Sequence, residues 1–299
     1  QGAQVRVDGD RVLLLCSDNY LGLADHPRIR AAATDAITRW GVGSGASRLI
    51  SGTMAVHGDL EERLARFHGT DAALLFGSRY LANTGTVPAL AGVGEVVYSD
   101  QLAHASIVDG CRLSRAETRV YRHRDTEHLA WLLADAGGRG GLIVTDGIFS
   151  VDGDVAPLVE LLELARRHRV RLMVDESHAT GAIGPGGRGT VAAAGLAGEV
   201  DVVIGSLGKA RGAFGAFAAC GSTMADYLAN SVRTFMFSTA PAPPLAAAAV
   251  AALELIEERP ELPRQLQENA AVLRGALRAE GFEMPDSGTH LMPLAFGDP

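Results

Sequence analysis

Short apolar runs alternate with amphipathic stretches along most of the chain. The runs are bounded by Gly, Asp and Ser, which predicts buried strands. These strands are expected at residues 72–76, 96–99, 142–146, 172–175, 202–205 and 214–219. Between several of them apolar residues recur at helical spacing, which predicts helices at 81–90, 126–134 and 157–168. This alternation predicts an α/β fold with a mostly parallel sheet and helices on both faces.

The pattern changes after residue 238. A proline cluster at 241–244 precedes a predicted helix that ends near residue 257, and a second helix is expected over 261–280. Residues 291–296 have the pattern of a strand. We therefore expect three parts, namely an N-terminal segment with substrate-side loops (1–50), a large α/β domain (51–240), and a linker helix with the start of a smaller α+β domain (241–299).

Composition and charge exclude several classes of protein. The 299 residues are 47% hydrophobic and 21% charged, which is ordinary for a globular protein with a large core. The net charge of −8 argues against nucleic-acid and membrane partners, because it provides no basic field. Cys16, Cys111 and Cys220 lie far apart, which favours neither disulfides nor a metal site. With no signal peptide and no membrane-spanning run, we expect a cytoplasmic protein.

The chain contains a single lysine, Lys209, among its 27 basic residues. A preference for arginine codons explains why lysines are few. It does not explain why one remains in a loop of small residues, in the stretch GSLGKARG. Arginine replaces lysine at little cost on a solvated surface, but its guanidinium cannot form a Schiff base. Lys209 is therefore a candidate Schiff-base lysine.

Asp175 ends a predicted buried strand in the run RLMVDESH. A carboxylate there is costly unless a positive partner meets it. The protonated pyridine nitrogen of pyridoxal 5′-phosphate (PLP) is such a partner. His178 follows three residues later, within reach of the same place. The plainer alternative is a strand-end aspartate that caps a turn, with His178 on the surface.

Three further loops carry candidate residues. Ser206 precedes Lys209 in a glycine-rich loop and could donate its hydroxyl to a phosphate. Ser78 and Tyr80 stand where a strand gives way to a helix, and helix N-termini bind phosphate. His104 begins another predicted helix and could stack on an aromatic cofactor. Each also has a purely structural interpretation, as an ordinary turn, a simple strand–turn–helix, or a surface histidine.

Together these motifs resemble the α-oxoamine synthases, a family of fold-type I PLP enzymes. The resemblance implies a large PLP-binding domain over 51–240 and runs in family order over nearly the whole chain. The matching stretches are SDNYLGL (17–23), GVGSGASRLISGT (41–53), HGDLEERLARF (57–67), GSRYLANTG (77–85), HASIVDG (104–110), DGIFSVDGDVAPL (146–158), VDESHATGAIGPGGRG (174–189) and GSLGKARGAFGAF (205–217).

The resemblance implies a role for each matching position. Lys209, His178 and His104 would be the catalytic residues, with PLP held on Lys209 as a Schiff base. A protonated His178 could also polarise carbonyl groups. The cofactor contacts would be Asp175 with the pyridine nitrogen, His178 and Ser150 with the phenolic oxygen, His104 with the ring face, Ser206 and the turn Ser78, Arg79 and Tyr80 with the phosphate, and Ser238 and Thr239 with the phosphate of the neighbouring subunit in a homodimer.

The implied reaction joins a small amino acid to an acyl-CoA, or to an acyl carrier protein thioester, and releases carbon dioxide to give an α-amino ketone. Members that use glycine tend to carry Thr where this chain has Ser47. The smaller side chain favours alanine, as in members that use a pimeloyl thioester in biotin synthesis. The alternatives are a glycine-using 2-amino-3-ketobutyrate ligase and an enzyme of secondary metabolism. Asp18 or Asn19 occupies the place of the asparagine that binds the amino acid.

Two departures from the family pattern stand close to these residues. Arg79 replaces the usual glycine, which would be costly if the position needs a positive φ and could crowd the ring or meet the phosphate. Arg211 replaces the usual leucine two residues after Lys209, and a buried arginine needs a partner. A further alternative is therefore a catalytically silent homologue.

Overall fold

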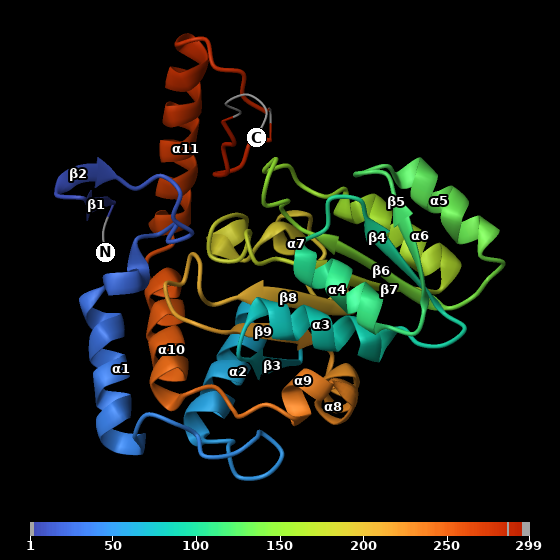
Figure 1. Ribbon diagram of the computed structural model, residues 1–299, viewed down its shortest axis with the longest axis horizontal. Helices are drawn as coiled ribbons and strands as arrows, with labels where there is room; N and C mark the ends of the chain where they lie inside the picture. Colours follow the sequence, from blue (N-terminus) through green and yellow to red (C-terminus); the bar gives the residue numbers. More distant parts are fainter. Residues whose placement is uncertain (1–2, 286, 295–299) are drawn as a thin grey trace.

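The computed structural model describes residues 3–285 and 287–294, and its main feature is a central sheet (Figure 1). β9 is antiparallel to both its neighbours, and the remaining pairs are parallel. The mostly parallel α/β fold predicted from the sequence is confirmed. The strand order is β3 (Ala72–Phe76), β9 (Ala216–Cys220), β8 (Val202–Ser206), β7 (Arg171–Asp175), β6 (Gly141–Asp146), β4 (Val96–Asp100) and β5 (Glu117–Tyr121).

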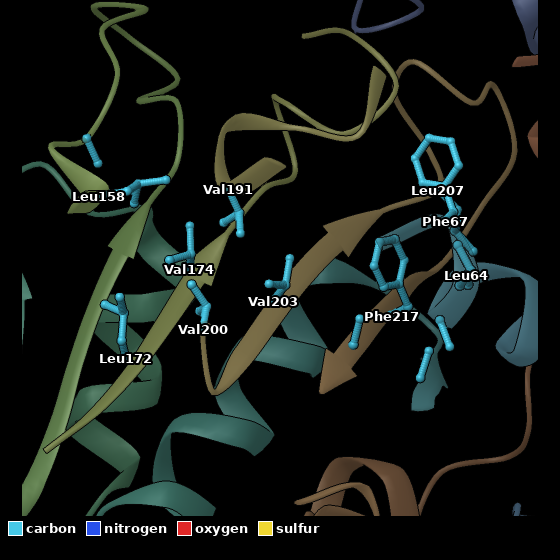
Figure 2. Packing of buried hydrophobic residues seen from close by; sticks show 14 of the residues in the cluster. Leu64, Phe67, Leu158, Leu172, Val174, Val191, Val200, Val203, Leu207 and Phe217 are labelled. Atoms are coloured by element: carbon cyan, nitrogen blue, oxygen red, sulfur yellow. The ribbon is translucent and has the colours of Figure 1, made fainter. Parts of the chain in front are cut away.

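Helices cover both faces of the sheet. Alternate side chains of each strand point to opposite faces, so β7 sends Leu172 and Val174 to one core and Met173 to the other. Figure 2 shows the first core, where Val174 and Phe217 lie on the same side as Phe67. The helices on this side are α2 (Ala55–His68), α5 (Thr126–Asp135), α6 (Leu158–His168), α7 (Thr190–Ala193) and α10 (Pro243–Glu258), and those on the other are α3 (Arg79–Leu90), α4 (Ala105–Leu113), α8 (Ser222–Ser231) and α9 (Arg233–Met236).

The first and last elements of the described chain lie on the same side of the molecule (Figure 1). A small hairpin of β1 (Gln4–Val7) and β2 (Asp10–Leu13) leads through η1 (Leu23–Asp25) to α1 (Pro27–Trp40). α1 packs along α10, and α11 (Glu261–Ala279) continues from it (Figure 1). Both C-terminal helices agree with the prediction. The proposed division into three parts stays a prediction.

The strand predicted over 291–296 is not observed where the structure describes it. Residues 291–294 have no regular structure, and 295 and 296 lie outside the described residues. Instead of pairing with a strand, this segment is fixed by Thr289, whose hydroxyl donates to Gly153 O at 2.6 Å. No described helix is long and apolar enough to cross a membrane.

Candidate active site

The strands that carry the candidate residues end at one edge of the sheet. β3, β6, β7 and β8 run in the same direction, because β9 reverses between β3 and β8. Their carboxyl ends therefore open together, as expected for a ligand site in an α/β fold. The groups gathered here are Arg79 after β3, His104 after β4, Asp146 at the end of β6, Asp175 and His178 at the end of β7, and Lys209 after β8.

Two buried carboxylates stand side by side at this edge. Asp146 and Asp175 are register partners on β6 and β7, and each is at most 1% exposed. Asp175 Oδ1 accepts Ser177 N–H at 2.9 Å, and Asp175 Oδ2 accepts Asn83 Nδ2–H at 2.6 Å. Asp146 Oδ2 accepts the N–H of His104 at 2.9 Å. Two negative charges this deeply buried require a cation beside them.

Arg79 supplies that cation. Its Nε donates to Asp175 Oδ2 at 2.6 Å, and its Nη2 donates to Asp146 Oδ1. Burial alone would lower the pKa of Arg79, but the two carboxylates outweigh it and raise the pKa. Burial acts to raise the pKa of Asp175, yet Arg79 holds it below the usual range. Burial raises the pKa of Asp146 to about 7, with Asp175 adding to the rise.

The position of Arg79 bears on two possibilities that the sequence raised, and its contact with a phosphate stays a prediction. Arg79 is the first residue of α3 and is not among the described non-glycine residues with positive φ, so its backbone carries no left-handed strain. Its guanidinium meets the two aspartates rather than a phosphate site at the helix N-terminus. Asn83 follows four residues later on the same helix face and also reaches Asp175. That spacing is the signal by which the sequence could have identified Asn83.

His178 is neutral at pH 7. Burial lowers its pKa to about 3, and the positive charges of Lys209 and Arg79 add to the effect. Burial thus disfavours a protonated His178 in this structure, and its role towards carbonyl groups stays a prediction. Its Nδ1 lies 2.7 Å from the hydroxyl of Tyr20, and its Nε2 lies 3.4 Å from Arg79 Nη1. Sequence reasoning missed Tyr20, although it stands beside the candidates Asp18 and Asn19.

Lys209 forms an ion pair with Asp18 Oδ2. Burial acts to raise the pKa of Asp18, but the hydrogen bond and charge of Lys209 outweigh it and lower the pKa. Asn19 instead uses its side-chain oxygen to accept Ala24 N–H at 3.1 Å. The structure therefore separates the two candidates of the SDN run, since Asp18 contacts Lys209 while Asn19 holds a turn.

His104 and Ser206 complete the edge. His104 caps the N-terminus of α4, and burial lowers its pKa to about 4, with Arg79 adding to the effect. Its ring is connected to Asp175 through hydrogen bonds: Nδ1 lies 2.7 Å from Ser106 Oγ, which accepts Asn83 Nδ2–H at 2.8 Å, and Asn83 also donates to Asp175. Ser206 is the buried last residue of β8, and its hydroxyl accepts Gly208 N–H at 3.1 Å. Four of the predicted residues, Lys209, Asp175, His178 and His104, thus converge.

Known proteins are similar to this chain in sequence and in fold. The aminotransferase class I and II family matches residues 10–299. Two proteins named 8-amino-7-oxononanoate synthase, from Citrifermentans bemidjiense and Geobacter sulfurreducens, are 51% and 52% identical over 99% and 100% of this chain, which spans 77% of each. The chain belongs to the α-oxoamine synthases of this family.

Solved structures agree with that assignment. Serine palmitoyltransferase from S. paucimobilis, with a bound PLP–myriocin aldimine, has a TM-score of 0.96 at 32% identity, covering 99% of this chain and 78% of that one. An 8-amino-7-oxononanoate synthase from Francisella tularensis has a TM-score of 0.76 at 26% identity, covering 90% of this chain and 76% of that one. The likeness to serine palmitoyltransferase covers nearly the whole of this chain, and therefore the strand ends described above.

Other candidates of this α-oxoamine synthase lie apart from the converging groups. Ser78 caps α3, where its hydroxyl accepts Leu81 N–H at 3.2 Å, and the exposed Tyr80 donates its hydroxyl to Asp109. Ser150 is exposed on a turn. Ser47 and Thr239 form an isolated β-bridge, next to Ser238. Within the described residues no hydrogen bond links these side chains to Lys209, Asp175 or His178, so their roles stay predictions.

Arg211 is fully buried without the partner expected for it. Its guanidinium lies 5.1 Å from the ring of Phe67 and 5.4 Å from that of Phe217. Its Nη2 is 3.4 Å from His68 Nε2, whereas Nε and Nη1 have no hydrogen-bond partner in the described structure. Burial lowers its pKa to about 9. In the described residues no cluster of His, Cys, Asp and Glu could hold a metal ion.

Proposed function

We propose that the protein is a PLP-dependent α-oxoamine synthase that joins alanine to a pimeloyl thioester and forms 8-amino-7-oxononanoate for biotin synthesis. The observation that carries the proposal is the position of Lys209. The chain's only lysine lies beyond the carboxyl ends of the same parallel strands as the buried Asp175. Relatives about half identical over nearly the whole chain carry the name of that enzyme.

The residues of the site fit PLP. Asp175 is a buried carboxylate paired with a cation, which is the environment that a pyridinium requires. Asn83 Oδ1 and Ser177 Oγ are buried beside it without hydrogen-bond partners in the described structure, as in a site that takes a ligand. Asp175 would hold the ring nitrogen, His104 the ring face and Lys209 the aldehyde carbon, while Ser206 would bind the phosphate. When bound, PLP supplies an electron sink for the carbanion formed at the amino acid's Cα.

The chain's own groups can bind, orient and move protons around that cofactor. Lys209 Nζ, as a neutral amine, would be the base placed to remove the Cα proton, and Asp18, its ion-pair partner in this structure, would orient it by accepting a hydrogen bond. His178 is neutral, so it can hydrogen-bond without adding positive charge, and Tyr20 fixes its ring through Nδ1. The family resemblance assigns Ser47 to the amino-acid side of the site, where its small side chain would leave room for the methyl group of alanine.

An assay of alanine, glycine and serine against acetyl-, pimeloyl- and palmitoyl-CoA tests the substrate proposal. We expect the highest kcat/KM for alanine with pimeloyl-CoA, and a fall in activity with alanine on Ser47→Thr, since one methyl group discriminates by about 1–3 kcal/mol. A preference for glycine with acetyl-CoA would instead establish the ligase alternative. A pimeloyl-carrier protein belongs in the same panel, because the thioester can be presented by either carrier.

The exposed apolar surface supports a homodimer. Ile50 and Phe237 are 80% and 69% exposed, and they flank the bridge between Ser47 and Thr239. Large exposed apolar side chains gathered in one place mark an interface. In this proposal Ser238 and Thr239 reach the phosphate of the neighbouring subunit, so light scattering should give twice the monomer mass. The unpaired cysteines fit the proposed cytoplasmic location.

A further inference from the structure

Asp175 Oδ2 has no free hydrogen-bonding position, because a carboxylate oxygen accepts about two donors. It is shared by Asn83 Nδ2–H and Arg79 Nε–H, both at 2.6 Å, while Oδ1 accepts Ser177 N–H. A pyridinium N–H that binds Oδ2 must displace one of these donors. Ser177 donates from the backbone and Asn83 is neutral. Arg79 is therefore the one donor whose replacement by a pyridinium leaves the charge around Asp175 unchanged.

We propose that Arg79 competes with the cofactor for Asp175, holding the cation position in the PLP-free protein and leaving it when PLP binds. The inference rests on the proposed function, because it takes PLP as the ligand of this site. It makes Arg79 an autoinhibitory contact built into the N-terminus of α3.

The packing of Arg79 supports a built-in contact rather than a stray side chain. The side chain is 9% exposed and touches Asp175, Asp146 and His178. Of these, Asp175 and His178 are proposed to contact the cofactor. Its backbone is helical, so nothing in α3 strains it towards another position. A guanidinium in this place excludes a pyridinium N–H from Oδ2, since that oxygen already accepts two donors.

Arg79 also has a second partner that would remain when it releases Asp175. Different nitrogens hold the two carboxylates, Nε for Asp175 and Nη2 for Asp146. The side chain can therefore rotate away from Asp175 while one ion pair persists. The pyridinium would replace the positive charge that Asp175 loses when Arg79 moves away. The exchange is thus electrostatically balanced, but PLP affinity carries the cost of breaking the Arg79–Asp175 pair.

The test compares the wild type, Arg79→Ala and the matched control Arg119→Ala, each starting from the PLP-free protein. Arg119 also bridges two carboxylates, Glu117 and Asp135, but it lies on β5 at the far edge of the sheet. Each protein is titrated with PLP, following Schiff-base absorbance, and each is melted with and without saturating PLP. We expect Arg79→Ala to bind PLP about tenfold or more tightly than the wild type, and Arg119→Ala to bind it as the wild type does.

The melting temperatures separate competition from a merely structural role. Without PLP, Arg79→Ala should melt several degrees lower, because Asp146 and Asp175 lose their cation. With PLP the difference from wild type should close or reverse, whereas Arg119→Ala should keep the same deficit in both states. Equal PLP dissociation constants for wild type and Arg79→Ala would overturn the competition alone. Absence of a Schiff base in both proteins would overturn the proposed function itself, and binding by Arg79→Ala only would support the competition in its strongest form.

Discussion

Replacing Arg211 with leucine removes a buried charge that has no carboxylate partner in the described structure. The guanidinium lies between the rings of Phe67 and Phe217, and its one hydrogen-bond partner is His68. His68 keeps a second partner, Thr180 Oγ1 at 3.2 Å, so the substitution leaves no new unpaired group there. Leucine fills part of the vacated space with apolar atoms. We expect the variant to be more stable than the wild type.

The magnitude follows from the cost of holding the charge. Burial lowers the pKa of Arg211 from 12.5 to about 9, and each unit corresponds to about 1.36 kcal/mol, so the charged form costs roughly 5 kcal/mol. The two aromatic contacts return about 0.5–2 kcal/mol each. The net cost is roughly 1–4 kcal/mol. Removing it should raise the free energy of unfolding by about that amount, within the range seen when buried ionic groups are replaced by apolar ones.

Urea unfolding of wild type, Arg211→Leu and the matched control Arg48→Leu measures the effect. Arg48 is nearly as buried but donates two hydrogen bonds to Glu61, at 2.7 and 2.8 Å. Its loss strands a carboxylate and should destabilise the protein by about 3 kcal/mol. The two substitutions should therefore act in opposite directions. A loss of stability in Arg211→Leu as large as that in Arg48→Leu would refute the reasoning.

Two further predictions concern histidines. Burial acts to lower the pKa of His123, but hydrogen bonds to Asp100 (2.8 Å) and Asp154 (3.0 Å) outweigh it and raise the pKa. Protonated His123 therefore stabilises the folded state fully below the pKa of about 6.5 that histidine has in the unfolded chain, and this stabilisation is lost as pH rises through the folded pKa. In urea titrations, the difference in unfolding free energy between the wild type and His123→Gln should narrow from pH 6 to pH 9. A difference that widens contradicts this. His178, with a pKa of about 3, should show imidazole NMR signals that do not titrate between pH 5 and 8, and a titration midpoint near 6.5 would disprove its burial.

The buried strands were predicted well, because a strand that is buried on both faces of the sheet has a continuous run of apolar residues. The run predicted at 72–76 coincides with β3, and that at 172–175 falls one residue short of β7. β5 was not predicted, because this edge strand is mostly exposed and reads Glu-Thr-Arg-Val-Tyr. The predicted start at residue 214 was two residues early, because Gly215, at φ 111°, still belongs to the turn before β9.

The site was predictable where chemistry and strand ends coincide. Asp175 and Lys209 each stand at or just after the end of a buried strand, so their convergence follows from the parallel sheet. The direction of the Arg79 side chain was not predictable, because it is set by Asp175, 96 residues later in the chain. The pairing of Tyr20 with His178 spans 158 residues for the same reason. Local patterns place residues on elements, but only the assembled fold shows which side chains meet.

Reductive trapping of PLP tests the central claim most directly. The protein is incubated with PLP, its absorbance at about 420 nm is recorded, and borohydride then fixes any Schiff base before peptide mass spectrometry. Because Lys209 is the only lysine of the chain, a lysine-linked adduct can have one position. We predict a visible band and a trapped cofactor on the peptide that contains Lys209, both lost in Lys209→Ala. An unchanged band in Lys209→Ala, or no trapped cofactor in either the wild type or Arg79→Ala, would contradict the account.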